Sequence, residues 1–438
     1  MRVARPLAAA LLSLACGAAT AAPVDMPATW RPWLDQVTAG RPASAAIPSA
    51  AELEALRANR ELLARWVAQA PSVAWNDVVQ GLVVKYQLNP LRASRVYTYV
   101  HVVIHDALVV CAQRGCEPTV RAVAMHAAAS RMLEHLYPNE SPGRFVALGR
   151  SGTAALLANL GGHNQAELAW QAGSDVAEAA IRRALNDGWD MPKLTPKRPA
   201  WKPGVWQAAP PMNLYDPAEP HAPQWRTWVL ASGAEIEPPP PLQYDSPAFW
   251  AEVDEVQSVA AALTSAQKKI AEDWNLDAGS VTPPGVWNLH ARRLALEHKL
   301  DTAATARMFS TVNVAMLDAF ISCWHTKYKW WTERPITVIR RHRDPNFLSH
   351  VLTPPFPSYT SGHSSVSGAG SQVLAGFFPK EAAELHRMAQ EASMSRLYGA
   401  IHFRSDNEEG LKVGRRIGAR ALARIAGDAV AQRAVTTR

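Results

Sequence analysis

Three short segments in the C-terminal half carry cationic, hydroxyl and imidazole side chains at spacings that suit the binding of an oxyanion. In the first segment, Lys327 and Arg334 stand seven residues apart, at the end of an apolar stretch that begins near Ala303 and is predicted to be helical. Seven residues turn an α-helix through about 700°, so the two cations are expected to project from nearly the same face. Pro335 disfavours helical backbone at Arg334, which predicts that the helix ends there. Taken alone, such a pair is typical of a solvated helix face.

The second segment is Pro-Pro-Phe-Pro-Ser-Tyr-Thr-Ser-Gly-His, which ends at His363. Its prolines favour an extended backbone, and a helix rich in small residues is predicted over residues 364–378. Thr360 or Ser361 can cap that helix, and Gly362 lets the backbone approach a ligand closely. A helix N-terminus attracts anions, and His363 can exchange a proton near neutral pH. Alone, the segment also fits an ordinary capped helix.

The third segment is Ser-Arg-Leu-Tyr-Gly-Ala-Ile-His-Phe-Arg-Ser-Asp, which ends at Asp406. Arg396 and His402 are six residues apart and would diverge on a regular helix, so a break in the helix is predicted near Gly399. His402 and Asp406 are four apart, a spacing at which the carboxylate can accept from one imidazole nitrogen and leave the other as a ligand or nucleophile. A neutral histidine in a buried hydrogen bond is the alternative.

Together the three segments supply three cations, two neutral donors and two histidines. A cation about 4 Å from an oxyanion contributes on the order of 4 kcal/mol at an effective dielectric of about 20, before its desolvation is subtracted. Three buried cations without a counter-charge repel one another, and a tetrahedral anion such as phosphate or vanadate resolves that repulsion. The combined pattern therefore predicts one oxyanion-binding cage.

These residues resemble the superfamily of vanadium-dependent haloperoxidases and type 2 phosphatidic-acid phosphatases. Its pattern is Lys-x6-Arg-Pro, then Pro-Ser-Gly-His, then Ser-Arg-x5-His-x3-Asp, and the three segments match it with Thr360 in place of the proline before Ser361. A weaker likeness at residues 282–287, 238–242 and 95–112 is to bacterial haloperoxidase-like proteins. The resemblance thus extends over most of the chain after residue 22.

The resemblance implies an all-α helical bundle with vanadate as its cofactor. His402, oriented by Asp406, would be the axial ligand of vanadium. The oxygens of vanadate would be held by Lys327, Arg334, Ser361, Gly362 and Arg396. In the related phosphatases, phosphate would occupy the same cage.

The resemblance also implies a reaction. His363 would act as the acid/base residue while hydrogen peroxide oxidises a halide to hypohalous acid, which halogenates a small organic acceptor. Trp324 and Phe356 would line the halide side of the site. Asp277 would pair with Arg396.

Two other functions remain open at this point. The same cage suits an exported acid phosphatase, in which His402 would attack phosphorus to form a phosphohistidine and His363 would protonate the leaving alcohol. A non-catalytic oxyanion-binding protein is the third hypothesis. The presence of two histidines and Asp406 argues against it, because simple anion binding needs no nucleophile oriented by a carboxylate.

The rest of the chain is predicted to be helical, because apolar residues recur at intervals of three and four and no useful stretch alternates as a strand would. Fourteen of the 33 prolines lie between positions 192 and 247, which predicts an extended surface connector that its tryptophans pin to the body. The predicted N-terminal helices span residues 51–70, 92–113, 120–136 and 165–186. The predicted divisions are a signal peptide (1–22), an N-terminal helical region (23–190), the connector (191–247) and a catalytic region (248–438).

Composition excludes several classes of protein. The chain is 48% hydrophobic and 19% charged, which excludes a disordered tail. Its net charge of +7 comes from dispersed residues, so we expect no nucleic-acid binding. No stretch after the N-terminus reaches 18 uninterrupted apolar residues, so no transmembrane segment is predicted. The oligomeric state is left open.

The N-terminus has the pattern of a secretory signal: Arg2 and Arg5 precede an apolar stretch and small residues suited to cleavage. The protein is therefore expected to be exported, to the periplasm or the medium. A lipoprotein anchored at Cys16 ranks second. In an oxidising compartment, Cys111 and Cys116 would form either a disulfide or a pair of partly buried thiols.

Two further groups are given structural interpretations. His101 and His105 have the spacing of a helical metal pair, but no third ligand is placed by the sequence, which favours packing or capping roles. The basic cluster at residues 340–343 is predicted to form a solvated turn after Pro335.

Overall fold

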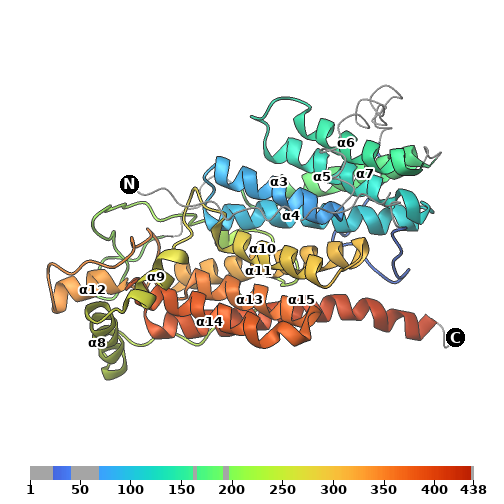
Figure 1. Ribbon diagram of the computed structural model, residues 1–438. Helices are drawn as coiled ribbons and strands as arrows, with labels where there is room; N and C mark the ends of the chain where they lie inside the picture. The colour runs from blue at the N-terminus through green and yellow to red at the C-terminus, as the bar shows by residue number, and fades with distance from the viewer. Residues whose placement is uncertain (1–22, 41–68, 161–164, 191–196, 436–438) are drawn as a thin grey trace.

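The computed structural model describes residues 23–40, 69–160, 165–190 and 197–435, and most of them are α-helical (Figure 1). The predicted signal peptide and nearly all of the helix predicted at 51–70 lie outside the described residues. Within the described residues there is no strand, and β-pairing is limited to one isolated bridge between Val205 and Thr332. The prediction of an all-α bundle is confirmed.

The N-terminal helices form one layer of the molecule, around a central apolar helix (Figure 1). Its members are α3 (Pro71–Lys85), α4 (Pro90–Gln113), α5 (Arg121–Leu136), α6 (Arg144–Leu160) and α7 (Ala166–Ala184), with a short 3-10 turn η1 (Pro118–Val120) before α5. The helices predicted at 92–113, 120–136 and 165–186 correspond to α4, α5 and α7. In this layer α4 packs against α5 and α7, and on its other side it contacts α11 (Thr302–Trp330) of the C-terminal half.

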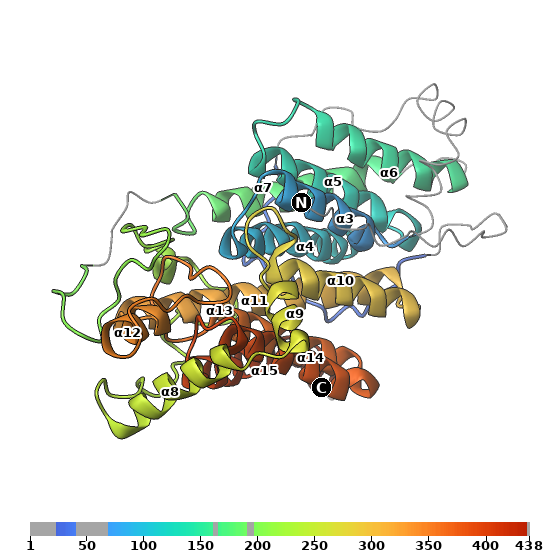
Figure 2. The same cartoon turned by 60° about the vertical axis from the view of Figure 1, so that its left-hand side comes forward.

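The C-terminal helices form the layer that carries the three motif segments (Figures 1 and 2). Besides α11 they are α8 (Pro247–Ala261), α9 (Ser265–Asp273), α10 (Thr282–Glu297), α12 (Pro335–His342), α13 (Gly362–Phe377), α14 (Ala382–Tyr398) and α15 (Arg404–Val435), with a 3-10 turn η3 (Pro379–Glu381) before α14. Of the basic cluster predicted as a turn, Arg340, Arg341 and His342 instead end α12 and only Arg343 lies in a turn, because Pro335 suits the first position of a new helix. The long helix α11 lies between α4 and α13 and so joins the two layers.

Close packing of α13 on α15 brings two motif segments together. A Cβ atom at Gly414 would lie 2.1 Å from the carbonyl oxygen of Ser365, and one at Gly368 would lie 2.6 Å from that of Leu411. Only glycine allows this approach, so the small residues of both helices set their separation. As a result the residues before α13 lie beside the first turn of α15.

The proline-rich connector holds a single short 3-10 turn, η2 (Ala222–Gln224), within residues 197–246, as its composition predicts. Trp206 and Trp225 are buried against the body, whereas Trp201 is 63% exposed and does not pin the chain. The backbone N–H of Trp206 donates to the carbonyl of Trp331 at 2.7 Å. The connector thereby fixes the link between α11 and α12, where one of the motif cations lies.

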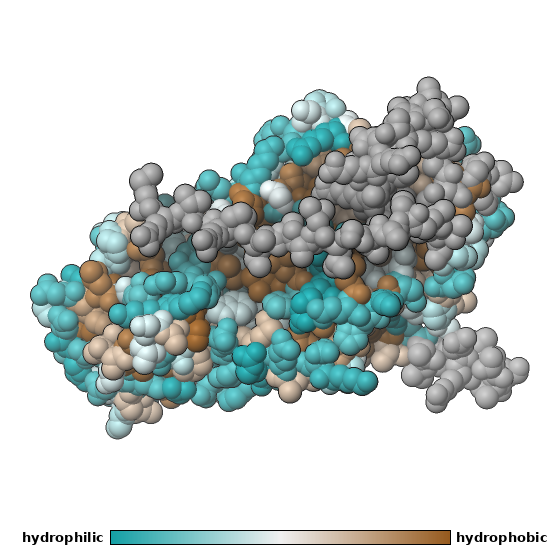
Figure 3. Space-filling model, in the orientation of Figure 1, coloured by the Kyte–Doolittle hydropathy of each residue, from teal (hydrophilic) through white to brown (hydrophobic). Residues whose placement is uncertain are grey.

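One described helix, α4, is long and apolar enough to cross a membrane, and 89% of its most apolar window is buried inside the fold. This burial is typical of the core helix of a globular protein. The face of the molecule in Figure 3 is a mosaic of hydrophilic residues and smaller hydrophobic groups over its described part.

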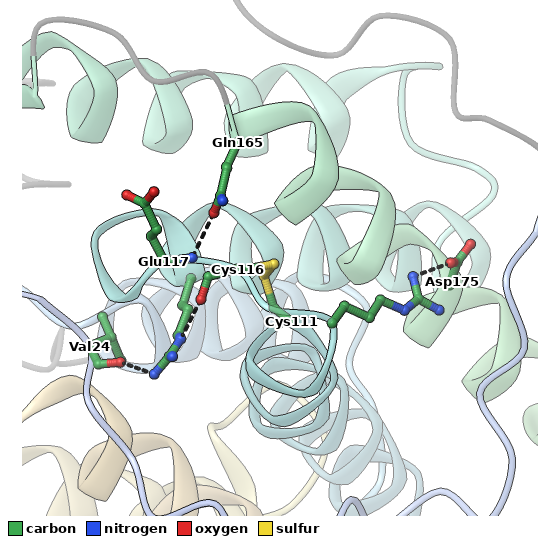
Figure 4. The surroundings of a disulfide bond; sticks show 8 residues. Val24, Cys111, Cys116, Glu117, Gln165 and Asp175 are labelled. Atoms are coloured by element: carbon green, nitrogen blue, oxygen red, sulfur yellow. Dashed lines mark hydrogen bonds and ion pairs between the residues drawn. A yellow bond between two sulfur atoms is a disulfide. The ribbon is translucent and has the colours of Figure 1, made fainter.

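Cys111, at the end of α4, forms a disulfide with Cys116 (Figure 4). Of the two possibilities that the sequence left open for this pair, the structure shows the disulfide. Cys323, the remaining cysteine of the described residues, is a buried thiol.

The two histidines of α4 are packed into the core. His101 is buried, stacks on Phe309 with ring centroids 4.5 Å apart, and its Nε2 lies 3.2 Å from Oδ1 of Asn76. His105 lies 2.8 Å from the carboxylate of Asp106. These contacts fit the packing role that the sequence favoured.

Candidate active site

Lys327 and Arg334 come from two elements, so the prediction that they share one helix face is wrong. The helix α11 ends at Trp330, and Trp331 adopts the left-handed conformation with φ of 51°. Arg334 then lies in extended backbone as the N-cap of α12, directly before Pro335. The helix stops early because the connector binds the backbone of the link.

Both cations nevertheless reach the same loop, the one that precedes α13. Nζ of Lys327 donates to the carbonyls of Pro357 and Ser358 at 2.8 and 2.9 Å. Nε of Arg334 donates to the carbonyl of Phe356 at 2.8 Å. The ring of Phe356 lies 4.9 Å from each cation, a distance at which the π face attracts positive charge.

The start of α13 presents donors, as predicted. Ser361 is the N-cap, and its Oγ accepts the N–H of Ser364 at 3.3 Å, which leaves the hydroxyl proton for an anion. Its own N–H donates to the carbonyl of Asp406 at 2.9 Å and thereby ties α13 to α15. Gly362 follows, and a Cβ atom there would lie 3.4 Å from the rings of Phe320 and Trp324. Gly362 is the first residue of α13, so its amide has no acceptor within the helix.

His402 is held by Asp406 in one tautomer. The break predicted near Gly399 is confirmed: α14 ends at Tyr398, and His402 lies in the link before α15. Nδ1 of His402 lies 2.9 Å from Oδ2 of Asp406, and the same oxygen accepts from Ser358 Oγ at 2.5 Å. Because a carboxylate accepts, Nδ1 carries the proton and Nε2 carries a lone pair. Nε2 lies 3.0 Å from Nη1 of Arg334.

His363 and Arg396 meet at the opposite side of the cage. Nε2 of His363 lies 2.8 Å from the carbonyl of Trp274, which can only accept, so this nitrogen carries the proton. Nη1 of Arg396 lies 3.1 Å from the same nitrogen. The proton on Nε2 of His363 is donated to that carbonyl, so this nitrogen cannot accept from Arg396, and an anionic oxygen nearby would give the guanidinium an acceptor.

Burial and mutual repulsion shift the pKa values of the cage residues. Burial lowers the pKa of Lys327 to about 7, that of Arg334 to about 9 and that of Arg396 to about 10. Burial, with nearby arginines, also holds the pKa values of His363 and His402 well below the usual range, so both rings are neutral. Without a bound anion, the charged forms of the residues that line the cage are thus destabilised relative to their neutral forms.

The residues fit an oxyanion such as vanadate. Nη2 of Arg334 and both Nε and Nη2 of Arg396 are buried and have no hydrogen-bond partner among the described residues. Unsatisfied buried donors are rare in proteins, and guanidinium groups match tetrahedral oxyanions well. With the hydroxyl of Ser361, the amide of Gly362 and the ammonium of Lys327, these atoms form a cradle of donors around the lone pair of His402.

The residues expected on the halide side lie together. The rings of Trp324 and Phe356 are 5.0 Å apart, next to the two cations. Nε1 of Trp324 donates to the carbonyl of Ala218 in the connector at 3.2 Å. Asp277 makes no hydrogen bond or ion pair with Arg396 among the described residues; its charge only offsets part of the lowering of the Arg396 pKa by burial.

Sequence reasoning missed several groups that support the site. Ser358 contacts Asp406 through its hydroxyl and Lys327 through its carbonyl, and its place within the second motif was the signal available. The carbonyls of Ala218 and Trp274 carry no sequence signal, because any residue has a carbonyl. Such backbone contacts emerge only from the fold.

The pKa of Lys327 predicts how the cage binds sulfate, which stays a dianion between about pH 6 and 8. A lysine with a lowered pKa loses its charge as the pH rises through about 7, whereas Arg334 and Arg396 stay charged. Sulfate affinity should therefore fall across this range by about tenfold, since a charge-assisted hydrogen bond contributes about 1.5–3 kcal/mol. Isothermal titration at several pH values would measure it. In Lys327→Met the affinity should be low throughout, and an equal slope in that variant would contradict the assignment.

Comparisons with known proteins agree with this geometry. The family model of the second helical-bundle domain of vanadium chloroperoxidases matches residues 307–386 and 382–428, which include every cage residue. A crystal structure of a bacterial vanadium-dependent iodoperoxidase is 29% identical in sequence, with a TM-score of 0.63 over 81% of this chain and 96% of that chain. The chain is thus similar to vanadium haloperoxidases, in the family model over residues 307–428 and in fold over most of its length.

Two further comparisons show the same similarity. The vanadium chloroperoxidase of Curvularia inaequalis is 27% identical over 332 residues, which are 60% of this chain and 54% of that protein. The chain thus spans about half the length of this curated relative. A bacterial vanadium-dependent chloroperoxidase, crystallised in apo form, shares the fold at 15% identity with a TM-score of 0.60 over 78% of this chain and 95% of that chain. The boundaries predicted at 190 and 247 are not tested by these matches and stay predictions.

Proposed function

We propose that this protein is a vanadium-dependent haloperoxidase, which binds vanadate in the cage and uses hydrogen peroxide to oxidise a halide to hypohalous acid. The relatives named above include a chloroperoxidase and an iodoperoxidase, which supports peroxidase rather than phosphatase chemistry. Because they differ in halide, they do not select one for this chain. The acceptor of the halogen is proposed to be a small organic molecule.

The observation that carries the proposal is the set of unpartnered guanidinium donors around the lone pair of His402. Bound vanadate would supply a Lewis-acidic centre that activates peroxide. His402 would bind it through Nε2, because Asp406 fixes the proton on Nδ1. Lys327, Arg334 and Arg396 would hold its oxygens and balance their negative charge.

His363 would move the proton that the reaction needs. Hydrogen peroxide, a halide and one proton give hypohalous acid and water, so the site must deliver a proton. Nε2 of His363 keeps its proton on the carbonyl of Trp274, so the proton that moves would be one that the ring first gains on Nδ1. An anion at this position would raise the lowered pKa of His363 back toward neutrality, which suits an acid/base group.

We also propose that the protein is exported. The predicted signal peptide lies outside the described residues. Support comes from the disulfide between Cys111 and Cys116, since disulfides persist in oxidising compartments. Expression with residues 1–22 fused to a reporter would test export directly.

The test of the function compares protein with and without added orthovanadate. Peroxide-dependent oxidation of iodide, bromide and chloride is measured beside hydrolysis of a phosphate monoester. We expect halide oxidation that requires vanadate and is suppressed by phosphate, which competes for the cage. Phosphate monoester hydrolysis that vanadate inhibits, without halide oxidation, would establish the phosphatase instead.

A further inference from the structure

The first turn of α15 carries Asp406, and it lacks a capping side chain of its own. Phe403 occupies the position before the helix, where its apolar side chain offers no acceptor to the first amides. The N–H of Ser405 would therefore have no local partner. Of the backbone N–H groups at this end of the helix, the Asp406 side chain accepts that of Phe403, at 3.1 Å, and not that of Ser405.

Glu252, on α8, supplies the missing cap from outside the helix. Its Oε1 accepts the N–H of Ser405 at 2.8 Å, and its Oε2 accepts the hydroxyl of Ser405 at 2.7 Å. The two contacts thus hold both the backbone and the side chain of Ser405. A carboxyl group at a helix N-terminus is also favoured by the helix dipole.

The residue that Glu252 holds directly precedes Asp406. A shift of Ser405 moves the Cα of Asp406, and the Asp406 carboxylate holds the proton of His402 on Nδ1 through a 2.9 Å contact. Glu252 and Asp406 both line a cavity of about 370 Å³ together with Phe403 and Tyr359. Hydrogen bonds to Ser405 therefore add to the packing of Phe403 against Phe249 in holding this turn.

We propose that Glu252 is a positioning residue for the pair formed by His402 and Asp406. It acts through Ser405, by fixing the first turn of α15, and does not itself touch the anion. The inference rests on the proposed function only where kcat and KM are measured, since orthovanadate binding can be measured without turnover.

Glutamine can replace this glutamate without loss of geometry. Burial raises the pKa of Glu252 to about 7, so the neutral acid is accessible near neutrality. A neutral acid, like an amide, accepts the N–H of Ser405 at one atom and donates to its hydroxyl at the other. Other charged groups around it are Glu255 on α8, Asp406 and Arg404 on α15, and Lys202 and Glu333, which line the same cavity.

The test uses the full chain with Glu252→Ala and Glu252→Gln, and with Glu255→Gln as a matched control. Glu255 stands on the same helix and contacts only Arg404 of α15 by hydrogen bonds, not Ser405. Orthovanadate affinity is measured by titration, the Nδ1 proton of His402 by NMR, and kcat and KM with halide. Glu252→Ala should lower affinity by about tenfold, as loss of groups that orient a metal ligand does, shift the Nδ1 signal and lower kcat more than the KM for halide.

Comparison of Glu252→Gln with Glu252→Ala distinguishes a positioning role of Glu252 from a general effect on folding. Glu252→Gln should stay within about twofold of the wild type, and Glu255→Gln should match it. The inference is overturned if folded Glu252→Ala keeps wild-type affinity and Nδ1 signal, if Glu252→Gln is as defective as alanine, or if Glu255→Gln loses as much. A wild-type protein that binds orthovanadate yet oxidises no halide would defeat the proposed function, while the affinity and NMR results would still decide this inference.

Discussion

A His402→Ala variant is expected to lose more than about 100-fold in orthovanadate affinity, because even groups behind a metal ligand cost 10–100-fold when removed. Nε2 of His402 carries the lone pair at the centre of the cage, and the side chains around it are hydrogen-bond donors. Without it, the cage could hold a tetrahedral anion only through hydrogen bonds. Vanadate-dependent halide oxidation should fall to background.

The variant should still bind sulfate, since Lys327, Arg334 and Arg396 remain. This difference between vanadate and sulfate distinguishes the loss of a ligand from a collapse of the cage. His325→Ala is the matched control: it lies on α11, contacts Glu237 and belongs to no part of the cage. Wild-type vanadate affinity in His402→Ala would remove His402 from the proposed role.

Asp406→Asn is expected to have the second largest effect, about 100-fold in vanadate affinity by the same comparison. Oδ2 of Asp406 accepts three hydrogen bonds, from His402, Ser358 and Phe403. An amide gives up the charge, and its NH2 group could turn toward Nδ1 and move the imidazole proton to Nε2, which blocks the lone pair. The variant also leaves Lys327 and Arg334 without the carboxylate charge that favours their charged forms.

The NMR signal of the His402 imidazole gives the direct readout of that tautomer. In the wild type the proton should sit on Nδ1, and in Asp406→Asn it should appear on Nε2. Asp254→Asn, a surface aspartate of α8 that pairs with Arg343, serves as the control for a lost charge. An unchanged tautomer together with unchanged affinity would contradict the account of Asp406.

The spacing of residues along the chain was enough to predict those parts of the site whose residues are close in sequence. His402 and Asp406 are four apart, and the predicted contact forms. The break near Gly399 and the cap at Ser361 likewise follow from single residues whose preferences are strong. These features need no information from the rest of the chain.

The sequence could not place Arg334 correctly, because the end of α11 depends on a distant segment. Trp206 in the connector binds the backbone at Trp331, and this contact spans more than 100 residues. The capping of Ser405 by Glu252 is also long-range. The sequence predicted that the helix ends at Arg334, whereas tertiary contacts end it four residues earlier, at Trp330.

A crystal structure of the protein soaked with orthovanadate would show directly whether the cage binds vanadate through His402. We expect one vanadate in the cage, bonded to Nε2 of His402, with its oxygens within hydrogen-bond distance of Lys327, Arg334 and Arg396. A vanadate bound elsewhere, or one in the cage that makes no bond to His402, would contradict it.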